Sequence, residues 1–315
     1  MWKLTTGVCR VSAAPQRREN FIEVACRLLC SATQLDDAGR SIIQEGQAKI
    51  LLHGNDVFYN KVQSHANRYK RVIVPVLSVW IDFYVRVFVR IYTSAKSVKE
   101  SSSKLSYVYQ CTGCHSFDLQ PVGQVCRKGD GISYKAGVGP TVSPECGECG
   151  KHWRMGGPLW SKPLHDSEWV SSVLKNITGS RSCYPAFDKV HCLLTAVTEE
   201  LPDVPLFVSL QALSATLKCL SPSKVMFCSA LSNAGYQSSG CHVSPSALKT
   251  DAPMHVIWDI MRCWVNLHPI KKQPDSSIGS IMLSKEPTLQ ADFRRITKGG
   301  GEERKKRFMP NPEKN

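Results

Sequence analysis

The sequence predicts an α+β fold with a zinc-knuckle segment in the middle and a helical, winged-helix-like unit toward the C-terminus. Three observations predict it: residues 71–92 indicate two strands, the second with clean alternation across 83–92, two Cys-x-x-Cys pairs lie between residues 105 and 160, and helical periodicity begins at Asp166. With 315 residues, 42% of them apolar, the chain can bury a core and is expected to form about two compact units.

The first 33 residues carry five basic and two acidic side chains. Such an Arg-rich, acid-poor composition is typical of a mitochondrial presequence, although a leader without defined structure fits equally well. The 14 cysteines come without a secretory signal, so we expect reduced thiols inside a cell. The most apolar run, 72–92, contains Pro75, Asp82, Arg86 and Arg90, which favours strands over a membrane span.

Residues 34–63 read as a partly extended segment that leads to a loop formed by Phe58, Tyr59 and Asn60. Two aromatic rings beside an amide suit stacking and hydrogen bonding to a planar base. Only a few residues separate this loop from the strands that follow, too few for any folded unit.

Residues 71–92 are expected to form two strands that meet between Ser78 and Asp82. In the second strand Val87 and Val89 point to one face, whereas Arg86, Phe88 and Arg90 point to the other. That second face could stack bases and pair phosphates. The alternative is a strand face that lies under a helix, with the arginine stems reaching out to solvent.

The strongest chemical signal is the pair of motifs QCTGCHSF and PECGECGKH. Two Cys-x-x-Cys turns can direct four thiolates at one ion, which predicts a closed, structural zinc site formed by Cys111, Cys114, Cys146 and Cys149. His115 or Cys126 could replace one of these ligands. A redox-active pair and unligated buried cysteines are the alternatives.

After the cysteine pairs, Asp166 is a suitable N-cap for a first helix, and a second is expected from Phe187 to Val197. Ser209 can cap a third helix, and Ser221–Pro222 can open a fourth that ends before Gly235. A short extended stretch and a last helix, 254–264, complete an order typical of winged-helix or helix-turn-helix units. Another small α+β module fits this order equally well. Residues 266–315 are expected to be a basic, largely disordered tail.

No glycine-rich turn between a strand and a helix appears in a convincing context, and no Asp-Pro-Pro-Tyr-like tetrad is present. The formal net charge of +14 favours a polyanionic partner. The residues alone therefore predict a zinc-stabilised protein that binds nucleic acid. No obligate protein partner is evident, and a DNA-binding zinc protein remains an alternative because of the winged-helix order.

Beyond these patterns, the strings DVFYNKVQ, YKRVIVPVLSVWIDFYVRVFVRIYT, PECGECGKHWRMGGPLWSKPLHD and IWDIMRCW occur in this order. In them the chain closely resembles the Trm1 family of tRNA (guanine(26)-N2)-dimethyltransferases. The resemblance implies a Rossmann-like methyltransferase domain, a family-specific C-terminal domain, S-adenosylmethionine as cofactor and tRNA as substrate. Methyl groups would pass to the exocyclic amine of a tRNA guanine, once or twice.

The chain departs from the family pattern directly after Asn60. The family's glycine-containing cofactor loop and its Asp-Pro-aromatic tetrad have no counterpart between Gln63 and Tyr69. We therefore predict no catalytic and no cofactor-binding residues, and a truncated, inactive variant of the family enzyme. The alternative is a non-catalytic, zinc-containing tRNA-binding protein.

The resemblance also implies roles for residues that are present. Phe58, Tyr59 and Asn60 would be the edge of a substrate pocket whose remainder is missing. Residues 71–92 would lose their neighbouring strands and leave an exposed apolar face and an open edge, a risk for aggregation. The residues expected to contact RNA are Arg86, Arg90, Lys249, Arg304, Lys305, Lys306 and Arg307.

The expected organisation has six parts. They are a leader (1–33), an N-terminal methyltransferase remnant (34–63), late methyltransferase strands (64–104), the zinc-binding segment (105–160), a tRNA-binding domain (161–265) and the tail (266–315). The basic tail can also act as a nuclear import signal, so the nucleus and the mitochondrion are both expected locations.

Overall fold

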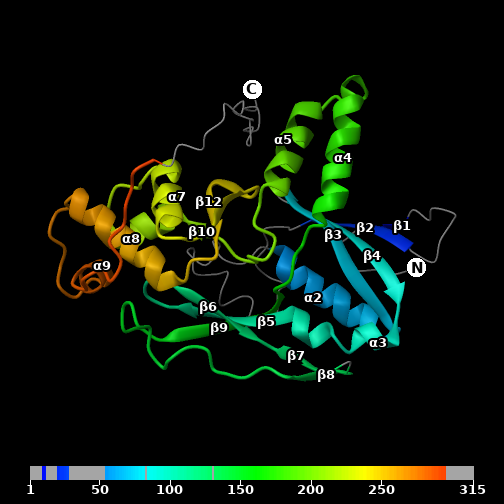
Figure 1. The fold of residues 1–315 in the computed structure, drawn as a ribbon, viewed down its shortest axis with the longest axis horizontal. Helices are drawn as coiled ribbons and strands as arrows, with labels where there is room; N and C mark the ends of the chain where they lie inside the picture. The colour runs from blue at the N-terminus through cyan, green and yellow to red at the C-terminus, as the bar shows by residue number, and fades with distance from the viewer. Residues whose placement is uncertain (1–8, 12–19, 28–53, 82–83, 130, 296–315) are drawn as a thin grey trace.

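The computed structural model describes residues 9–11, 20–27, 54–81, 84–129 and 131–295. Helices and antiparallel sheets alternate along these residues, as the sequence predicts for an α+β fold (Figure 1). All pairings between the described strands are antiparallel. None of the helices in this part of the chain is both long and apolar enough to cross a membrane.

The described strands are β1 (Cys9–Val11), β2 (Asn20–Arg27), β3 (Arg71–Ile81), β4 (Tyr84–Thr93), β5 (Leu105–Cys111), β6 (Phe117–Pro121), β7 (Gly123–Lys128), β8 (Gly131–Ala136), β9 (Trp153–Trp160), β10 (Val208–Ser209), β11 (Ser238–Cys241) and β12 (Ser244–Thr250). The described helices are α2 (Gly54–Asn67), α3 (Ala95–Val98), α4 (Ser167–Gly179), α5 (Phe187–Thr198), α6 (Leu210–Leu217), α7 (Lys224–Asn233), α8 (Met254–Leu267) and α9 (Ile278–Leu283).

The first sheet has the strand order β1-β2-β4-β3, and β3 and β4 form the expected hairpin. The register shifts between Pro75 and Leu77, where proline offers no N–H to the ladder. Val87 and Val89 are buried on one face, beneath α2, as the alternation predicts. On the other face Leu77 packs against residues of α4 and α5.

Both faces of this hairpin are therefore covered, which corrects the expectation of an exposed apolar surface. The expected open edge of β4 is also closed, because β2 pairs with β4 from Asn20–Ile91 to Arg27–Tyr84. Residues 20–27 thus form a strand within a segment that the sequence favours as a leader. The aggregation risk inferred from missing neighbouring strands does not apply to this arrangement.

The segment expected to be a loop at Phe58, Tyr59 and Asn60 is part of α2. Its buried side chains recur at helical spacing, with Tyr59 and Gln63 fully buried and Val62 and Ala66 packed beside them. A tight turn closes the helix, since the N–H of Tyr69 donates to Ala66 O and that of Lys70 to Asn67 O. The α2 helix lies between the first sheet and β9 (Figure 1).

A second sheet, β6-β5-β9, carries the predicted zinc-binding segment, and β7 and β8 form a separate hairpin beside it. Val108 and Leu159 of this sheet pack with Leu206 from the following unit. The four predicted cysteine ligands share one hydrophobic cluster with α6, α7 and α8. The zinc-binding segment and the C-terminal unit therefore have a common core.

The C-terminal unit contains a three-stranded sheet, β10-β12-β11, with α6 and α7 between β10 and β11 in the chain. Asp166 caps α4 and Ser209 caps α6, as predicted. The cap of α7 is Ser223, two residues after the predicted opening at Ser221, and Gly235 follows the helix with φ +87°.

The expected disordered tail is ordered up to residue 295. The α9 helix lies in this part, and Met282 is fully buried. Leu289 and Phe293 pack against the core that contains α8. Turn-forming and charged residues dominate this stretch, but its few apolar side chains are enough to fix it on α8. The predicted RNA contacts Arg304, Lys305, Lys306 and Arg307 lie outside the described residues.

Candidate metal centre and adjoining pocket

Four cysteine sulfurs meet at the end of β5 and in the turn before β9. The Sγ atoms of Cys111 and Cys149 are 3.3 Å apart, those of Cys114 and Cys146 are 3.6 Å apart, and all four lie within 4.8 Å of one another. Each of these residues is buried, and all four are free thiols. A tetrahedral zinc ion with Zn–S bonds of about 2.3 Å places its sulfurs about 3.8 Å apart. The four sulfurs therefore fit such an ion.

The two Cys-x-x-Cys turns have the same backbone geometry. The N–H of Cys111 donates to Ser116 O and that of Cys146 donates to Lys151 O, each five residues on and each at 2.8 Å. The residue after the second cysteine of each pair is left-handed, His115 with φ +62° and Gly150 with φ +69°. The two halves of the site are thus built alike.

Gly113 allows the two turns to approach one another. A Cβ atom at this position would lie 2.9 Å from Cys149 Sγ and 2.8 Å from Lys151 Cγ, so only glycine fits without displacement. Its own N–H donates to Cys111 Sγ at 3.3 Å. Backbone N–H groups directed at sulfur stabilise thiolates, which are the form that binds metal.

Because the four sulfurs lie so close together, their pKa values shift in opposite directions. Hydrogen bonds from Cys111 and Cys114 lower the pKa of Cys146 to about 6, and a hydrogen bond from Cys111 also lowers the pKa of Cys149. Hydrogen bonds with Cys111, Cys146 and Cys149, together with burial, raise the pKa of Cys114. Four buried thiolates cannot coexist without a neutralising cation, so the donor set requires a cation for its fully deprotonated form.

Side chains from α8 hold the cysteine turns in place. Trp258 Nε1 donates to Ser116 Oγ at 2.7 Å, and Ser116 Oγ lies 3.0 Å from Cys114 Sγ. The buried Arg262 guanidinium pairs with Asp259 at 2.6 Å and with Glu148, which lies between Cys146 and Cys149. The site is therefore anchored on a helix that the cysteine motifs do not include.

The candidate substitutes for a zinc ligand are not part of this cluster. Cys126 is in β7, and neither it nor His115 belongs to a group of potential metal ligands among the described residues. The structure brings together the four cysteines that the spacing of the two pairs selects.

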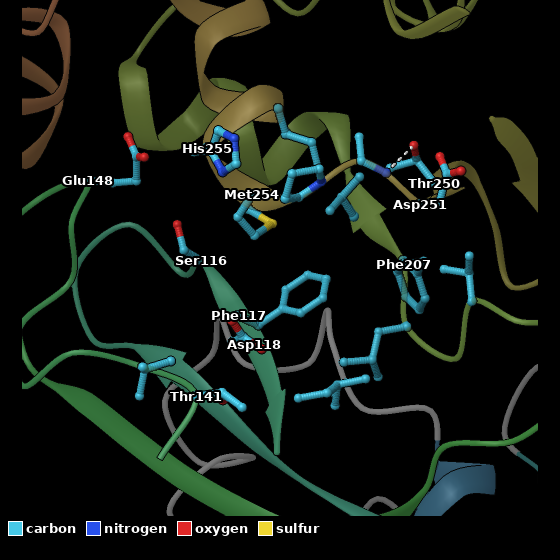
Figure 2. A pocket seen from close by; sticks show the side chains of 18 of the residues that line it. Ser116, Phe117, Asp118, Thr141, Glu148, Phe207, Thr250, Asp251, Met254 and His255 are labelled. Carbon is cyan, nitrogen blue, oxygen red and sulfur yellow. Dashed lines mark hydrogen bonds between the residues drawn. The ribbon is translucent and has the colours of Figure 1, made fainter. Parts of the chain in front are cut away.

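A pocket of about 560 Å³ adjoins the cysteine turns (Figure 2). Phe117 on β6 and Phe207 before β10 supply aromatic walls, and Met254 at the start of α8 lies opposite Phe117. Asp118, Thr250 and Asp251 add polar groups. Burial raises the pKa of Asp118. The pocket therefore combines an apolar interior with carboxylates, a surface suited to a planar group that carries hydrogen-bond donors.

Thr250 and Asp251, which directly follow Lys249 in the chain, shape one side of this pocket. Thr250 Oγ1 accepts the N–H of Ala252 at 3.1 Å, shown by the dashed line in Figure 2. Asp251 accepts the N–H of Gln237 at 2.8 Å. These bonds fix the turn between β12 and α8.

A second polar cluster, His165–Glu200–His242–Lys249, lies against β3. His242 Nδ1 is 2.6 Å from Glu200 Oε1, and Lys249 Nζ is 3.1 Å from Glu200 Oε2. Burial raises the pKa of Glu200, but His242 and Lys249 outweigh this effect and hold the pKa below its usual range. The lysine ammonium already balances the carboxylate, so we assign no metal here.

This cluster also protects the outer edge of β3. The N–H of Ser78 donates to His165 Nδ1 at 3.3 Å, and the N–H of Trp80 donates to His242 Nε2 at 3.2 Å. Two imidazoles thus take the place of a neighbouring strand. Sequence reasoning missed the cluster because Glu200 and His242 are 42 positions apart and form no short motif.

Acid is expected to destabilise the protein through His165. Burial, together with the nearby His242, lowers the pKa of His165 to about 3. Because the unfolded residue takes up its proton near pH 6.5, stability is lost as the pH falls from 6.5 toward 3. We expect a decrease of about 2 kcal/mol in the free energy of unfolding between pH 6.5 and pH 5 from this residue. Urea denaturation of the wild type and of His165→Gln measures it, and equal pH slopes would contradict the assignment.

The other predicted site residues occupy interior or partly covered positions. Tyr59 is fully buried, with its ring 5.7 Å from that of Trp160, and Asn60 Nδ2 donates to Pro158 O at 3.1 Å. The side chain of Phe58 is outside the described residues. Neither Tyr59 nor Asn60 lines the pocket beside the cysteines.

The predicted RNA-binding face of β4 lies under α4. Phe88 packs against Trp169 with ring centroids 6.4 Å apart, and Arg90 Nη1 is 3.7 Å from Asp166 Oδ2. This is the arrangement that the alternative interpretation of the strand describes, although Arg86 is exposed. Lys249 is only 4% exposed and pairs with Glu200, so its ammonium is not presented to a ligand at the surface.

Residues 41–262 match the family model described as N2,N2-dimethylguanosine tRNA methyltransferase. The "tRNA (guanine(26)-N(2))-dimethyltransferase 1" of Arabidopsis thaliana is 58% identical over 256 residues, which cover 80% of this chain and 43% of the relative. The mitochondrial enzyme of that name from Saccharomyces cerevisiae is 32% identical, over 72% of this chain and 42% of the relative. The chain thus spans less than half the length of these curated relatives.

The fold is similar to that of a solved structure, Trm1 from Pyrococcus horikoshii in complex with S-adenosyl-L-methionine. The TM-score is 0.56 at 23% sequence identity, and the match covers 76% of this chain and 58% of that chain.

Proposed function

This chain belongs to the N2,N2-dimethylguanosine tRNA methyltransferase family, and we propose that it binds tRNA as part of the guanine N2-methylation function of that family. The family match over residues 41–262 is the observation that carries the proposal. The reaction of the family moves methyl groups from S-adenosylmethionine to the exocyclic amine of a tRNA guanine. We assign to this chain the tRNA-binding part of that function.

The residues present do not fit a site for the methyl donor at the position that the family resemblance implies. Tyr59 and Asn60, expected at the pocket edge, are engaged with Trp160 and Pro158. The α2 helix passes through Gln63 and turns directly into β3. We therefore derive no step through S-adenosylmethionine in this chain and keep the inactive variant as a prediction.

We propose that the metal bound by this protein is one structural zinc ion. Cys111, Cys114, Cys146 and Cys149 would hold it, and it would supply the positive charge that lets four buried thiolates coexist. Four protein ligands leave no open position, so the ion would join two turns and take no part in chemistry.

The C-terminal unit is proposed to be winged-helix-like. The order β10, α6, α7, β11 and β12, with β10 paired to β12, supports this proposal. In such units the second helix reads a DNA groove. Here α7 exposes Val225 and Asn233, and its Lys224 ammonium is bonded to the carbonyls of Pro245 and Ala247. A helix without free cations argues against the DNA-binding alternative.

The segment boundaries at residues 33, 63, 104, 160 and 265, and the nuclear or mitochondrial location, remain proposals. A relative named as mitochondrial supports one of the two locations.

The affinity for tRNA is expected to fall steeply with salt, because basic groups displace counterions condensed on the phosphates. With a net charge of +14, a protein that contacts about five phosphates would lose roughly a hundredfold or more in affinity between 50 and 200 mM salt. Filter binding with a tRNA transcript across this range measures the slope. Absence of tRNA binding at low salt would overturn the proposed function, and tighter binding to duplex DNA would favour the DNA alternative.

A further inference from the structure

The β7–β8 hairpin has no role in the function proposed so far. It is inserted between the two cysteine turns and pairs with no other described strand. Its base is packed, where Gly123 meets Ser102 so closely that a Cβ atom would lie 2.6 Å from Ser102 Oγ. An isolated two-stranded hairpin is only marginally stable in water. A hairpin that also exposes apolar side chains is therefore a candidate surface for binding a partner.

The register of the hairpin divides its side chains into two distinct faces. Val125 lies opposite Tyr134, and Arg127 lies opposite Ile132, so these four residues share one face. Val125 is 41% exposed and Ile132 is 52% exposed. The other face carries Lys128 and Lys135 with small and polar residues. One face is thus apolar, with one tyrosine and one arginine, and the other is basic.

The charge of the hairpin favours an anionic partner. Arg127, Lys128 and Lys135 are exposed, and no ion pair involves them among the described residues. The single acidic residue between 123 and 136 is Asp130 at the turn, whose placement is outside the described residues. Arg127 shares a face with the Tyr134 ring, and Lys128 and Lys135 lie on the other face of the same narrow ribbon. Cations and an aromatic ring together are the combination with which proteins bind phosphates and stack unpaired bases.

Further exposed cations continue from the base of the hairpin. The 3-10 helix that supports it, Ser101–Lys104, follows α3 closely, and α3 is beside β3 (Figure 1). Lys96 and Lys99 lie on and after α3, and Arg68 and Lys70 lie in the turn between α2 and β3. The N–H of Ser94 donates to Lys70 O at 3.0 Å, which joins these two turns. The cations thus extend from the hairpin toward the end of the first sheet.

We propose that the β7–β8 hairpin is an RNA-contact arm, in which Tyr134 and Ile132 pack against an unpaired base and Arg127, Lys128 and Lys135 bind the adjoining phosphates. This proposal rests on the proposed tRNA-binding function and names a surface for it. Lys96, Lys99, Arg68 and Lys70 extend the phosphate contacts toward the first sheet. An RNA partner satisfies both faces at once, since its bases cover the apolar face and its backbone neutralises the cations.

Charge reversal tests the phosphate contacts. The triple variant Arg127→Glu, Lys128→Glu, Lys135→Glu is compared with Lys175→Glu, Lys271→Glu, Lys272→Glu, which changes the net charge equally at exposed positions outside the hairpin. We expect the hairpin variant to lose at least about tenfold in tRNA affinity relative to the control, with a log–log salt slope shallower by about 2 to 3. Equal affinity and slope in the two variants would overturn the proposal.

Removal of the aromatic ring tests the base contact. Tyr134→Ala is expected to weaken tRNA binding about tenfold with little change in the salt slope, because stacking releases no counterions. Tyr184→Ala, which removes an exposed tyrosine between α4 and α5, is the matched control and should bind like the wild type. Equal effects of the two substitutions would overturn the stacking contact.

Photo-crosslinking provides a test that needs no variant. Wild-type protein bound to 4-thiouridine-containing tRNA is irradiated, and the crosslinked peptides are identified by mass spectrometry. Crosslinks within residues 123–136 support the proposal, and crosslinks confined to other segments overturn it. Wild-type protein that fails to bind tRNA at all would overturn the proposed function instead, so the two failures are distinguishable.

Discussion

Replacement of Cys111 or Cys146 by serine is expected to abolish zinc binding and to unfold residues 105–160. The four sulfurs share one buried cluster with α6, α7 and α8, so loss of the ion would remove the bonds that join the two cysteine turns inside this core. The apparent binding energy of a structural zinc site is about 10 to 16 kcal/mol at pH 7, and here it would also be folding energy. Zinc content by metal analysis should fall from about one per chain to near zero, and the thermal midpoint should fall with it.

Cys126→Ser is the matched control for this experiment. Cys126 lies on the β7–β8 hairpin, away from the cysteine cluster, so its replacement should leave zinc content and thermal midpoint unchanged. A Cys111→Ser or Cys146→Ser protein that keeps the wild-type midpoint would refute the ligand assignment. Zinc loss in Cys126→Ser would show that the ligand set differs from the four cysteines.

The elements that the sequence predicts well are those whose signals are local. Asp166 precedes a helical pattern and caps α4. The alternation in β4 correctly predicts that Val87 and Val89 are buried. Each Cys-x-x-Cys turn is closed by a backbone hydrogen bond between residues five positions apart, so its backbone conformation is set locally, whereas its anchoring on α8 is not. Local chemistry is sufficient in these cases.

Other features depend on contacts between distant segments and could not be read from short stretches. The sequence predicts a loop where α2 lies, because an aromatic pair beside an amide is typical of a base-stacking loop. The helical spacing of Tyr59, Val62, Gln63 and Ala66 gains its meaning only from the sheet and β9 against which they pack. The partner of β4 comes from residues 20–27, whose composition indicates a leader. Glu200 and His242 meet only because α5 and the β11–β12 turn both approach the edge of β3.

Addition of S-adenosylmethionine to the purified chain is expected to give no saturable heat in calorimetry and no methyl transfer to tRNA. The cofactor loop and the Asp-Pro-aromatic tetrad that the family resemblance implies have no counterpart between Gln63 and Tyr69. The structure continues α2 through this junction, and the N–H of Lys70 donates to Asn67 O immediately before β3 begins. A sulfonium donor needs a crevice that holds it against the acceptor amine, and Tyr59 is instead packed against Trp160.

The Pyrococcus horikoshii protein, which has been solved with S-adenosyl-L-methionine, is the positive control for the calorimetry. Ligand binding also raises stability, by about 2.7 kcal/mol at a hundredfold excess over the dissociation constant, so a thermal shift gives an independent readout. The relative should show this shift and the present chain should not. Labelled methyl groups on tRNA after incubation with this chain alone would contradict the prediction, because transfer requires a donor site. That result would assign donor binding to residues outside α2 and β3.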